Sequence, residues 1–166
     1  MFYIRSANEA DLEAIRVLLV ETWRETYTPF HGPQKIEAMI DGWLSPEALE
    51  RRLRRPKSEF LVADDGRQIA GMAFAAMAKD RPNVANLHQL YVHPIWQRQG
   101  IGTDLFAEIE TCFPDASVMQ LEVTAENDRA IAFYEALGFA PVGRIDNVGP
   151  PGAAIPAILM EKQLDF

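Results

Sequence analysis

The sequence predicts one domain of the mixed α/β (α+β) class, built around a sheet of about seven strands. Some segments place apolar residues at helical spacing, while others are short runs of strand-forming residues bounded by turns. In chain order these segments give a strand, several helices, three strands, a helix, a strand, a helix and two strands. No internal repeat, linker or low-complexity segment interrupts the 166 residues. We therefore expect residues 1–166 to form a single domain.

The N-terminal part predicts a strand, a helix and a loop. Residues 2–5 suit a short strand, and Asn8 is then a typical helix N-cap, with Asp11 in the capping-box position. The helix should run to about Arg24, because apolar residues recur at helical spacing at Leu12, Ile15, Leu18 and Leu19. Residues 27–33 contain two prolines and a glycine, so we expect a loop there.

Two further helices should follow. One is expected over residues 35–43. Ser45-Pro46-Glu47 then combines an N-cap, a proline at the first helical position and an acid in the first turn. The helix that starts there should end near Pro56, and it carries a basic run of Arg51, Arg52, Arg54 and Arg55. We interpret this run as a solvated helix face, with contact to a phosphate as the alternative.

The rest of the chain predicts strands separated by two helices. The strands, each bounded by turn or stop residues, are expected at residues 59–64, 69–78, 84–92, 118–124, 139–145 and 157–163. The first two should form a hairpin that turns at Gly66. Helices are expected over residues 102–112 and from Asn127 or Asp128 to Leu137, where Gly138 ends the second one.

Composition argues against several partners and compartments. A formal net charge of −8 repels a phosphate backbone, so a nucleic-acid partner is disfavoured. An acidic field favours a cationic ligand such as an amine, although many proteins are acidic for solubility alone. Cys112 is the sole cysteine, which fits a reducing cytosol. No apolar run approaches the ~20 residues of a membrane helix, and the charged N-terminus lacks the apolar core of a signal peptide. We expect a cytoplasmic protein without a membrane partner.

The densest chemical signal lies where a strand gives way to a helix. His93 and Pro94 end the strand, and Gln97-Arg98-Gln99-Gly100-Ile101-Gly102-Thr103 leads into the next helix. Glycines permit positive φ and a close backbone approach, and a helix N-terminus offers unpaired N–H groups to a phosphate. A Walker loop would end in Gly-Lys-Ser/Thr, and a Rossmann fingerprint would have three glycines; this loop has neither. A plain tight turn is the remaining alternative.

A second motif follows the next strand, Leu121-Glu122-Val123. It has the form Asn-x-x-Ala-x-x-Phe-Tyr-x-x-x-Gly-Phe, with its fixed positions at Asn127, Ala130, Phe133, Tyr134, Gly138 and Phe139. The loop matches a further pattern, Gln/Arg-x-x-Gly-x-Gly/Ala, at Gln97, Gly100 and Gly102. With these two motifs in this order, the sequence resembles the GNAT superfamily of N-acetyltransferases. The order of strands and helices agrees with that family over nearly the whole chain.

The resemblance implies a GNAT fold and acetyl-CoA as cosubstrate. In that fold a mixed, mostly antiparallel sheet splays between its fourth and fifth strands, and four to five helices flank it. The pantetheine arm would pair in the gap with the backbone of a bulged strand, at Leu90, Tyr91 and Val92. The pyrophosphate would lie on the loop, at Gln97, Arg98, Gln99, Gly100, Ile101, Gly102 and Thr103. Further coenzyme contacts would come from Asn127, Ala130, Phe133 and Tyr134.

Acetyl transfer to an amine needs a base for the ammonium, donors for the oxyanion and an acid for the thiolate. By resemblance Tyr134 is the acid, with a core aromatic as the alternative. Glu122 matches the glutamate that ribosomal-protein N-terminal acetylases use as base, and His88 on the adjacent strand suits proton relay. A solvated Glu122 and a water chain remain alternatives. Asn86 stands where histone-type members carry their glutamate, so that assignment fails here.

The acceptor pocket is expected near Trp23, Tyr27 and Phe30, where the family builds it from its first helices. Aromatic rings together with Glu21 and Glu25 suit a cationic amine, while ordinary core aromatics are the alternative. The expected function is acetyl transfer to the primary amine of a small molecule, by direct attack in a ternary complex. A protein N-terminal acetylase and a non-catalytic acyl-CoA-binding sensor are the alternatives.

Three further expectations concern metal, assembly and the last loop. His31 and His93 are isolated from other metal-binding residues in the sequence, so we expect no metal. Many relatives dimerise, so a homodimer is possible. The loop of residues 149–152 borders the acceptor site or a dimer contact in relatives, or it is a plain rigid connection.

Overall fold

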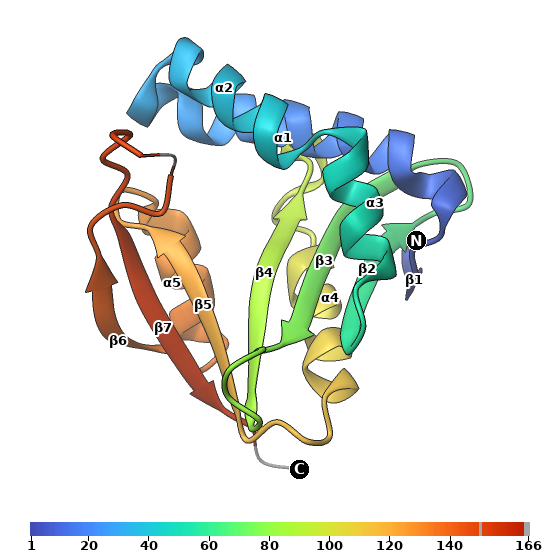
Figure 1. Ribbon diagram of the computed structural model, residues 1–166. Helices are drawn as coiled ribbons and strands as arrows, with labels where there is room; N and C mark the ends of the chain where they lie inside the picture. The colour runs from blue at the N-terminus through green and yellow to red at the C-terminus, as the bar shows by residue number, and fades with distance from the viewer. Residues whose placement is uncertain (150, 165–166) are drawn as a thin grey trace.

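The computed structural model describes residues 1–149 and 151–164, which form one sheet flanked by helices (Figure 1). Its strands are β1 (Tyr3–Ser6), β2 (Ser58–Asp64), β3 (Ile69–Met77), β4 (Val84–Val92), β5 (Val118–Thr124), β6 (Ala140–Ile145) and β7 (Ala157–Gln163). The α-helices are α1 (Leu12–His31), α2 (Pro33–Trp43), α3 (Pro46–Arg54), α4 (Ile101–Ile109) and α5 (Asp128–Ala136). Short 3₁₀ helices are η1 (Glu9–Asp11), η2 (Pro94–Trp96) and η3 (Glu110–Cys112). The predicted order of strands and helices is confirmed.

The seven-stranded sheet has the order β1-β2-β3-β4-β5-β7-β6. Its neighbours are antiparallel except for β4 and β5, which run parallel. That parallel ladder joins only Val84, Ala85 and Asn86 to Val118, Met119 and Gln120. Beyond it the two strands diverge into a V, and α1 and α2 lie across the open end (Figure 1). The predicted splay between the fourth and fifth strands is therefore confirmed.

A bulge bends β4 close to the point where the strands part. Phe74 of β3 lies opposite Gln89, whereas the next residue, Ala75, lies opposite Leu87. His88 is thus the extra residue on β4, and such a residue increases local twist and redirects side chains. The bulge expected in this strand is present, and it sets His88 near the apex of the V, where β4 and β5 part.

Each face of the sheet carries its own apolar core. On one face α4 packs with Leu105, Phe106 and Ile109 against Leu87 and Leu121, among others. On the other face α1, α2 and α3 bury a second set that includes Ile15, Leu19, Ile36, Ile40 and Leu49. Burying one such side chain stabilises the fold by about 1.5–3 kcal/mol. These two cores hold β3 and β4 rigidly, so the V opens beside a fixed strand.

Two predicted helix starts are confirmed in their hydrogen bonds. The side chain of Asn8 accepts from the N–H of Ala10 at 2.9 Å, and Asp11 Oδ2 accepts from the N–H of Asn8 at 2.8 Å. This is the reciprocal capping box that the sequence predicts. Ser45 Oγ accepts from the N–H of Ala48 at 3.1 Å and begins α3 in the same way.

The predicted loop at residues 27–33 is wrong, because α1 continues to His31. Pro29 lies in the last turns of this helix, where it removes one backbone donor. Burial of Tyr27 on the inner face offsets that cost. The helix ends one residue later at Gly32, whose φ of +79° is the left-handed conformation that glycine adopts easily.

An ion-pair network ties the N-terminal strand to the first helix and to β2. Arg5 donates from Nη1 and Nη2 to the two carboxylate oxygens of Asp11 at 2.8 Å each, and from Nε to Asp64 Oδ2 at 3.0 Å. Hydrogen bonding to Arg5 lowers the pKa of Asp11, despite partial burial that acts in the opposite direction. The charged form of Asp11 is therefore the one that stabilises the folded state.

We expect Asp11→Asn to destabilise the protein by about 2 kcal/mol at pH 7, because it removes two charge-assisted hydrogen bonds. A lowered folded-state pKa gives stability above the ordinary carboxyl pKa and loses it as pH falls through the folded value. The difference between variant and wild type should therefore shrink below about pH 4. Urea unfolding at several pH values measures this difference in the free energy of unfolding. Glu37→Gln, which breaks the exposed ion pair with Arg24, is the matched control. A pH-independent difference would contradict this account.

Candidate active site

The divergence of β4 and β5 opens two clefts that share part of their lining. The α4 cleft, of about 660 Å³, is lined by the end of β4 and the starts of α4 and α5. The α3 cleft, of about 480 Å³, is lined by α1, α2, α3 and the facing edges of β4 and β5. Both are lined by Tyr27, Leu87, His88, Gln89, Tyr91, Leu121 and Glu122. The clefts therefore meet between the strands, so groups bound in each can come into contact.

The N-terminus of α4 opens onto the α4 cleft. Gly100 precedes the helix with φ +83° and offers no capping side chain. The first intrahelical bond runs from the N–H of Asp104 to the carbonyl of Gly100 at 3.0 Å. The N–H groups of Ile101, Gly102 and Thr103 therefore come before any carbonyl partner within the helix. Such a helix mouth fits the diphosphate of a coenzyme.

Arg98 also adopts a left-handed conformation, with φ +64°. A non-glycine residue at positive φ costs on the order of 1 kcal/mol, and such strain is typical of functional loops. Arg98 and Gly100 both line the cleft, whereas the exposed Gln99 between them does not. The strained backbone therefore curls the loop around the helix mouth.

The two sequence motifs meet at Gly102. A Cβ atom on this glycine would lie 3.2 Å from the ring of Phe133, which belongs to the second motif. The missing side chain thus lets the start of α4 approach α5 closely. Ala130 and Phe133 line the same cleft, and Asn127 caps α5 by accepting from the N–H of Ala130 at 3.2 Å.

Alternate residues of β4 turn their main-chain groups toward the gap. The N–H of His93 donates to Ala70 of β3 at 2.8 Å, so Tyr91, two residues earlier, also faces β3. Leu90 and Val92 then direct their N–H and carbonyl groups toward β5, from which β4 has separated. Of the three predicted residues, these two have main-chain groups placed to pair with an extended ligand.

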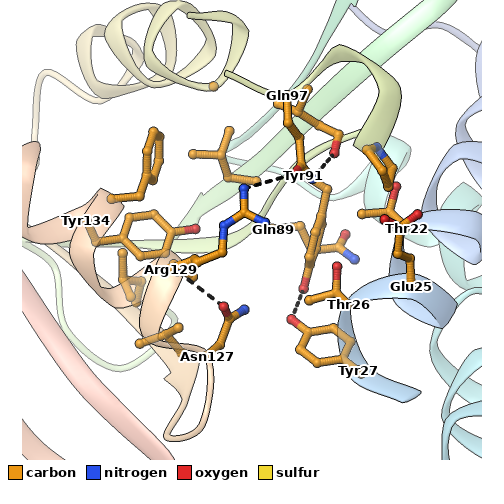
Figure 2. A pocket seen from close by; sticks show the side chains of 18 of the residues that line it. Thr22, Glu25, Thr26, Tyr27, Gln89, Tyr91, Gln97, Asn127, Arg129 and Tyr134 are labelled. Carbon is orange, nitrogen blue, oxygen red and sulfur yellow. Dashed lines mark hydrogen bonds between the residues drawn. The ribbon is translucent and has the colours of Figure 1, made fainter. Parts of the chain in front are cut away.

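Gln97 and Arg129 connect the two sides of the α4 cleft (Figure 2). Gln97 Nε2 donates to the carbonyl of Val92 at 3.0 Å, and its Oε1 accepts from Arg129 Nη2 at 3.5 Å. The Gln97 side chain thus folds back onto the strand. Sequence reasoning missed Arg129, whose signal is a basic residue in the first turn of α5, inside the second motif.

Tyr134 lies on α5 with its hydroxyl pointing into the α4 cleft (Figure 2). Its half-buried ring packs edge-on against Phe133 and Phe139 at 5.3 and 5.7 Å between centroids. Burial, and to a smaller extent the nearby Tyr27, raise the pKa of Tyr134. The phenol therefore keeps its proton throughout the neutral pH range.

Tyr27 and Tyr91 join α1 to β4 where the two clefts meet. Their hydroxyl oxygens are 2.9 Å apart, as Figure 2 shows. Burial raises the pKa of both phenols, so both are neutral and share one hydrogen bond. Trp23 packs edge-on against Tyr27 at 5.8 Å and completes the aromatic wall.

Glu122 and His88 are titratable side chains in the lining of both clefts. Glu122 is exposed between buried Leu121 and Val123, which is the alternation expected of a strand. Although part of the His88 side chain is exposed, desolvation by the surrounding groups lowers the pKa of His88 to about 4, with Arg55 and then Arg52 adding to the effect. Arg55 Nη1 lies 3.4 Å from His88 Nε2. His88 is therefore uncharged at neutral pH.

The predicted acceptor residues separate between the two clefts. Trp23 and Tyr27 line the α3 cleft, but Phe30, 47% exposed, and Glu25 line only the α4 cleft. Glu21 lies in neither lining and contacts His93 Nε2 at 2.6 Å. The acids expected beside the acceptor are therefore absent from the α3 cleft.

Arginines line the α3 cleft instead. Interpreting the basic run as wholly solvated is wrong, because Arg52 and Arg55 line this cleft and are only half-exposed. Arg51 and Arg54 are exposed as predicted, and Arg54 pairs with Glu50 at 2.9 Å. Arg81, from the turn between β3 and β4, joins the lining by donating to Gln120 on β5. Arg52 lies on the face of α3 that is turned to this cleft, and Arg55 is the extended residue that follows the last turn of the helix.

The residues that the structure describes contain neither a metal-binding group nor a membrane-spanning helix. Within residues 1–149 and 151–164, no three His, Cys, Asp or Glu side chains are grouped to hold a metal ion. In the same residues no helix has the length and apolar character needed to cross a bilayer. The Gly149–Gly152 loop includes residue 150, which is outside the described residues; Val148 and Ile155 on either side line the α3 cleft.

Comparison with known proteins agrees with this geometry. Residues 27–163 match a family model described as an acetyltransferase (GNAT) domain. Over 104 residues the chain is 34% identical to the N-alpha-acetyltransferase RimI of Mycobacterium tuberculosis, covering 62% of this chain and 65% of that protein, just under two thirds. It is 28% identical over 142 residues to the spermidine N(1)-acetyltransferase of Thermoplasma acidophilum, covering 82% and 86%.

A solved structure gives the same result in three dimensions. The PaiA N-acetyltransferase of Thermoplasma acidophilum, in complex with coenzyme A, matches with a TM-score of 0.82 and 25% identity, covering 98% of this chain and 99% of that one. The free N–H groups at the mouth of α4 and the unpaired edge of β4 fit such a coenzyme. The chain belongs to the GNAT acetyltransferase family and is an acetyl-CoA-dependent acyltransferase.

Proposed function

We propose that this enzyme acetylates the primary amine of a small molecule by direct attack within a ternary complex. The observation that supports this most strongly is the pair of clefts that meet at Glu122 and His88. One cleft can hold the coenzyme while the other holds the acceptor, so both substrates can be bound together. A volume of about 480 Å³ for the α3 cleft lies within the range of small-molecule sites.

The α4 cleft would bind the coenzyme along its whole length. The amides of Ile101, Gly102 and Thr103 would hold the diphosphate, and Arg98 would add a positive charge beside it. The main-chain groups of Leu90 would pair with the pantetheine arm, while the carbonyl of Val92 accepts from Gln97 and its N–H would face the acetyl oxygen. Bound in this way, acetyl-CoA supplies an acetyl thioester at the junction of the clefts.

Two side chains would carry the proton transfers of the reaction. Glu122, directly or through water, accepts a proton from the ammonium and leaves a neutral amine. The amine nitrogen forms a bond to the acetyl carbon as the carbon–sulfur bond breaks, and the nitrogen then loses its second proton to solvent to give the neutral amide. Tyr134 donates its hydroxyl proton to the departing sulfur, and the N–H of Val92 stabilises charge on the acetyl oxygen. The proton on Glu122 then returns to Tyr134 through solvent.

His88 is poorly suited to the role of base. A group with a pKa of about 4 is almost wholly neutral at pH 7, but it binds a proton too weakly to take one from an alkylammonium. Its stacking on Phe74, at 5.7 Å between centroids, instead supports a role in shaping the junction.

We expect Glu122→Gln to lower kcat/KM at least about tenfold, because the amide retains the shape of the side chain but accepts no proton. His88→Ala should leave the acidic limb of the pH–rate profile unchanged above about pH 5.5, since the wild-type ring is already neutral there. Profiles of kcat/KM for both variants test this. An acidic limb that moves in His88→Ala, but not in Glu122→Gln, would reverse the assignment.

A protein N-terminal acetylase is the second candidate, favoured by the RimI similarity and by the Leu121-Glu122-Val123 strand. Thiol release from acetyl-CoA with small amines and with peptides of free N-terminus separates the two candidates. Faster turnover of the small amines supports the first proposal. Binding of acetyl-CoA without turnover of any acceptor would identify a non-catalytic sensor.

A further inference from the structure

The α3 cleft has an unusual charge for this chain. The protein has a formal net charge of −8, yet three guanidinium groups line this cleft, on Arg52, Arg55 and Arg81. Glu122 is the single carboxylate among the described lining residues. The cleft is therefore positively charged within an acidic protein, which is the reverse of what a polycationic acceptor needs.

These three arginines also lack carboxylate partners. In the described part of the chain none of them forms an ion pair within 4 Å, a property they share with every arginine except Arg5, Arg24 and Arg54. Arg52 is the most enclosed: Nη2 donates to the carbonyl of Trp43 at 2.8 Å, but Nη1 has no partner. Burial lowers the pKa of Arg52, yet a guanidinium stays charged at neutral pH. Enclosed charge of this kind is stabilised by an anion.

A separate observation concerns unused hydrogen-bonding atoms. Five buried side-chain nitrogen or oxygen atoms in the described residues have no partner, namely Trp23 Nε1, His31 Nε2, Arg52 Nη1, Gln89 Oε1 and Thr124 Oγ1. All five belong to residues that line the α3 cleft. Four of these five atoms can donate a hydrogen bond. The residues of this cleft therefore hold more unused donors than acceptors, although each of these atoms is itself covered by neighbouring groups.

The aromatic rings of this cleft do not oppose that conclusion. Trp23 is 4% exposed and packs edge-on against Tyr27 and Trp43, at 5.8 Å in each case. Because Trp23 is almost wholly buried, its ring is not free to stack on a bound cation. These rings act as the apolar wall of the cleft.

We infer that the acceptor is a small amine that also carries a carboxylate or phosphate group, which the guanidiniums of Arg52, Arg55 and Arg81 bind in the α3 cleft. This inference rests on the proposed function, because it names the class of acceptor for the same site. Arg55 lies beside His88, so the bound anion would direct the amine toward the junction where Glu122 lies. Nearby positive charge also favours the neutral form of an amine, which is the form that attacks.

Paired acceptors test the inference directly. The twenty L-amino acids would be compared with their C-terminal amides, O-phosphoethanolamine with ethanolamine, and spermidine would serve as a cationic probe. We expect the best anionic acceptor to exceed its neutral partner in kcat/KM by at least tenfold and to exceed spermidine as well. The amino-acid and phosphoethanolamine arms show which anion is preferred. Equal or better use of the neutral partners or of spermidine would overturn the inference.

Matched arginine variants locate the effect. Arg55→Gln should lower kcat/KM for the anionic acceptor at least fivefold, mainly through KM, with little change for its neutral partner. Arg51→Gln, on the exposed face of α3 four residues earlier, should change kcat/KM for neither acceptor by more than about twofold. The KM for acetyl-CoA should stay constant in both variants. Equal behaviour of Arg55→Gln and Arg51→Gln would exclude anion binding at α3.

A binding measurement keeps the inference separate from the proposed function. Calorimetric titration of the protein–coenzyme A complex with each amino acid and its amide requires no turnover. Acetyl-CoA binding without acetylation of any amine would reject the proposed function, while tighter binding of the anionic ligands would still support the inference. Acetylation of amines without any preference for anionic ones would support the proposed function and reject the inference about the acceptor. Equal binding of the anionic ligands and their amides in calorimetry would also reject the inference.

Discussion

Tyr134→Phe should lower kcat at least tenfold, and on the order of a hundredfold, while leaving the affinity for acetyl-CoA nearly unchanged. Removing a general acid typically costs 10²–10⁴ in rate. The phenylalanine ring keeps the edge-on contacts with Phe133 and Phe139, so the cleft should keep its shape. The structure shows no hydrogen bond from the Tyr134 hydroxyl to another described side chain, so its loss leaves no buried partner unpaired.

The physical argument depends on the shared environment of the phenol and the sulfur. Burial raises the pKa of Tyr134, which on its own would make it a weaker acid. The same burial would also destabilise a thiolate formed beside it, so the proton transfer stays close to balanced. The phenol is also protonated well above pH 7, so the wild-type enzyme should show no alkaline limb from Tyr134 below about pH 10.

Steady-state kinetics with a saturating acceptor measures kcat, and calorimetry with coenzyme A measures the affinity for the coenzyme. Phe133→Leu is a matched control, because it alters a neighbouring ring of the same cleft that has no proton to give. It should weaken coenzyme binding more than it lowers kcat. Full activity of Tyr134→Phe would remove the acid role and would point to solvent as the proton source.

The fold could be predicted largely from local sequence. The predicted strands at residues 84–92 and 118–124 have the observed bounds of β4 and β5, because proline and turn residues limit both. The end of α1 could not be predicted in the same way. Pro29 predicts a break, but the burial of Tyr27 against the sheet depends on tertiary contacts that local sequence does not show.

Part of the candidate site could be predicted from local sequence, and part could not. The coenzyme residues lie in two continuous motifs, and all the predicted ones except Gln99 line the α4 cleft. The α3 cleft instead takes Arg52 from α3, Arg81 from a turn and Glu122 from β5, which are distant in sequence. Only the fold brings these three residues together. The acidic composition of the whole chain suggested a cationic acceptor, whereas the arginines that line the α3 cleft favour an acceptor with an anionic group.

Thr103→Glu should weaken acetyl-CoA binding at least about thirtyfold while leaving the fold intact. Thr103 is exposed in the first turn of α4, and it lines the α4 cleft. A carboxylate about 4 Å from two phosphates loses about 1 kcal/mol per charge pair even at the dielectric constant of water, or about 2 kcal/mol in total. That energy corresponds to roughly a thirtyfold change in Kd.

The same substitution should not harm the helix, which makes the result specific. A carboxylate in the first turn of a helix stabilises it by about 0.3–1 kcal/mol, so the thermal unfolding temperature without ligand should stay constant or rise. Thr103→Gln has nearly the same size without the charge and should bind acetyl-CoA within about threefold of wild type. Raising the salt concentration should partly restore binding to Thr103→Glu, because the repulsion is electrostatic. If Thr103→Glu binds as tightly as Thr103→Gln, the diphosphate lies elsewhere, and the helix mouth serves only the fold.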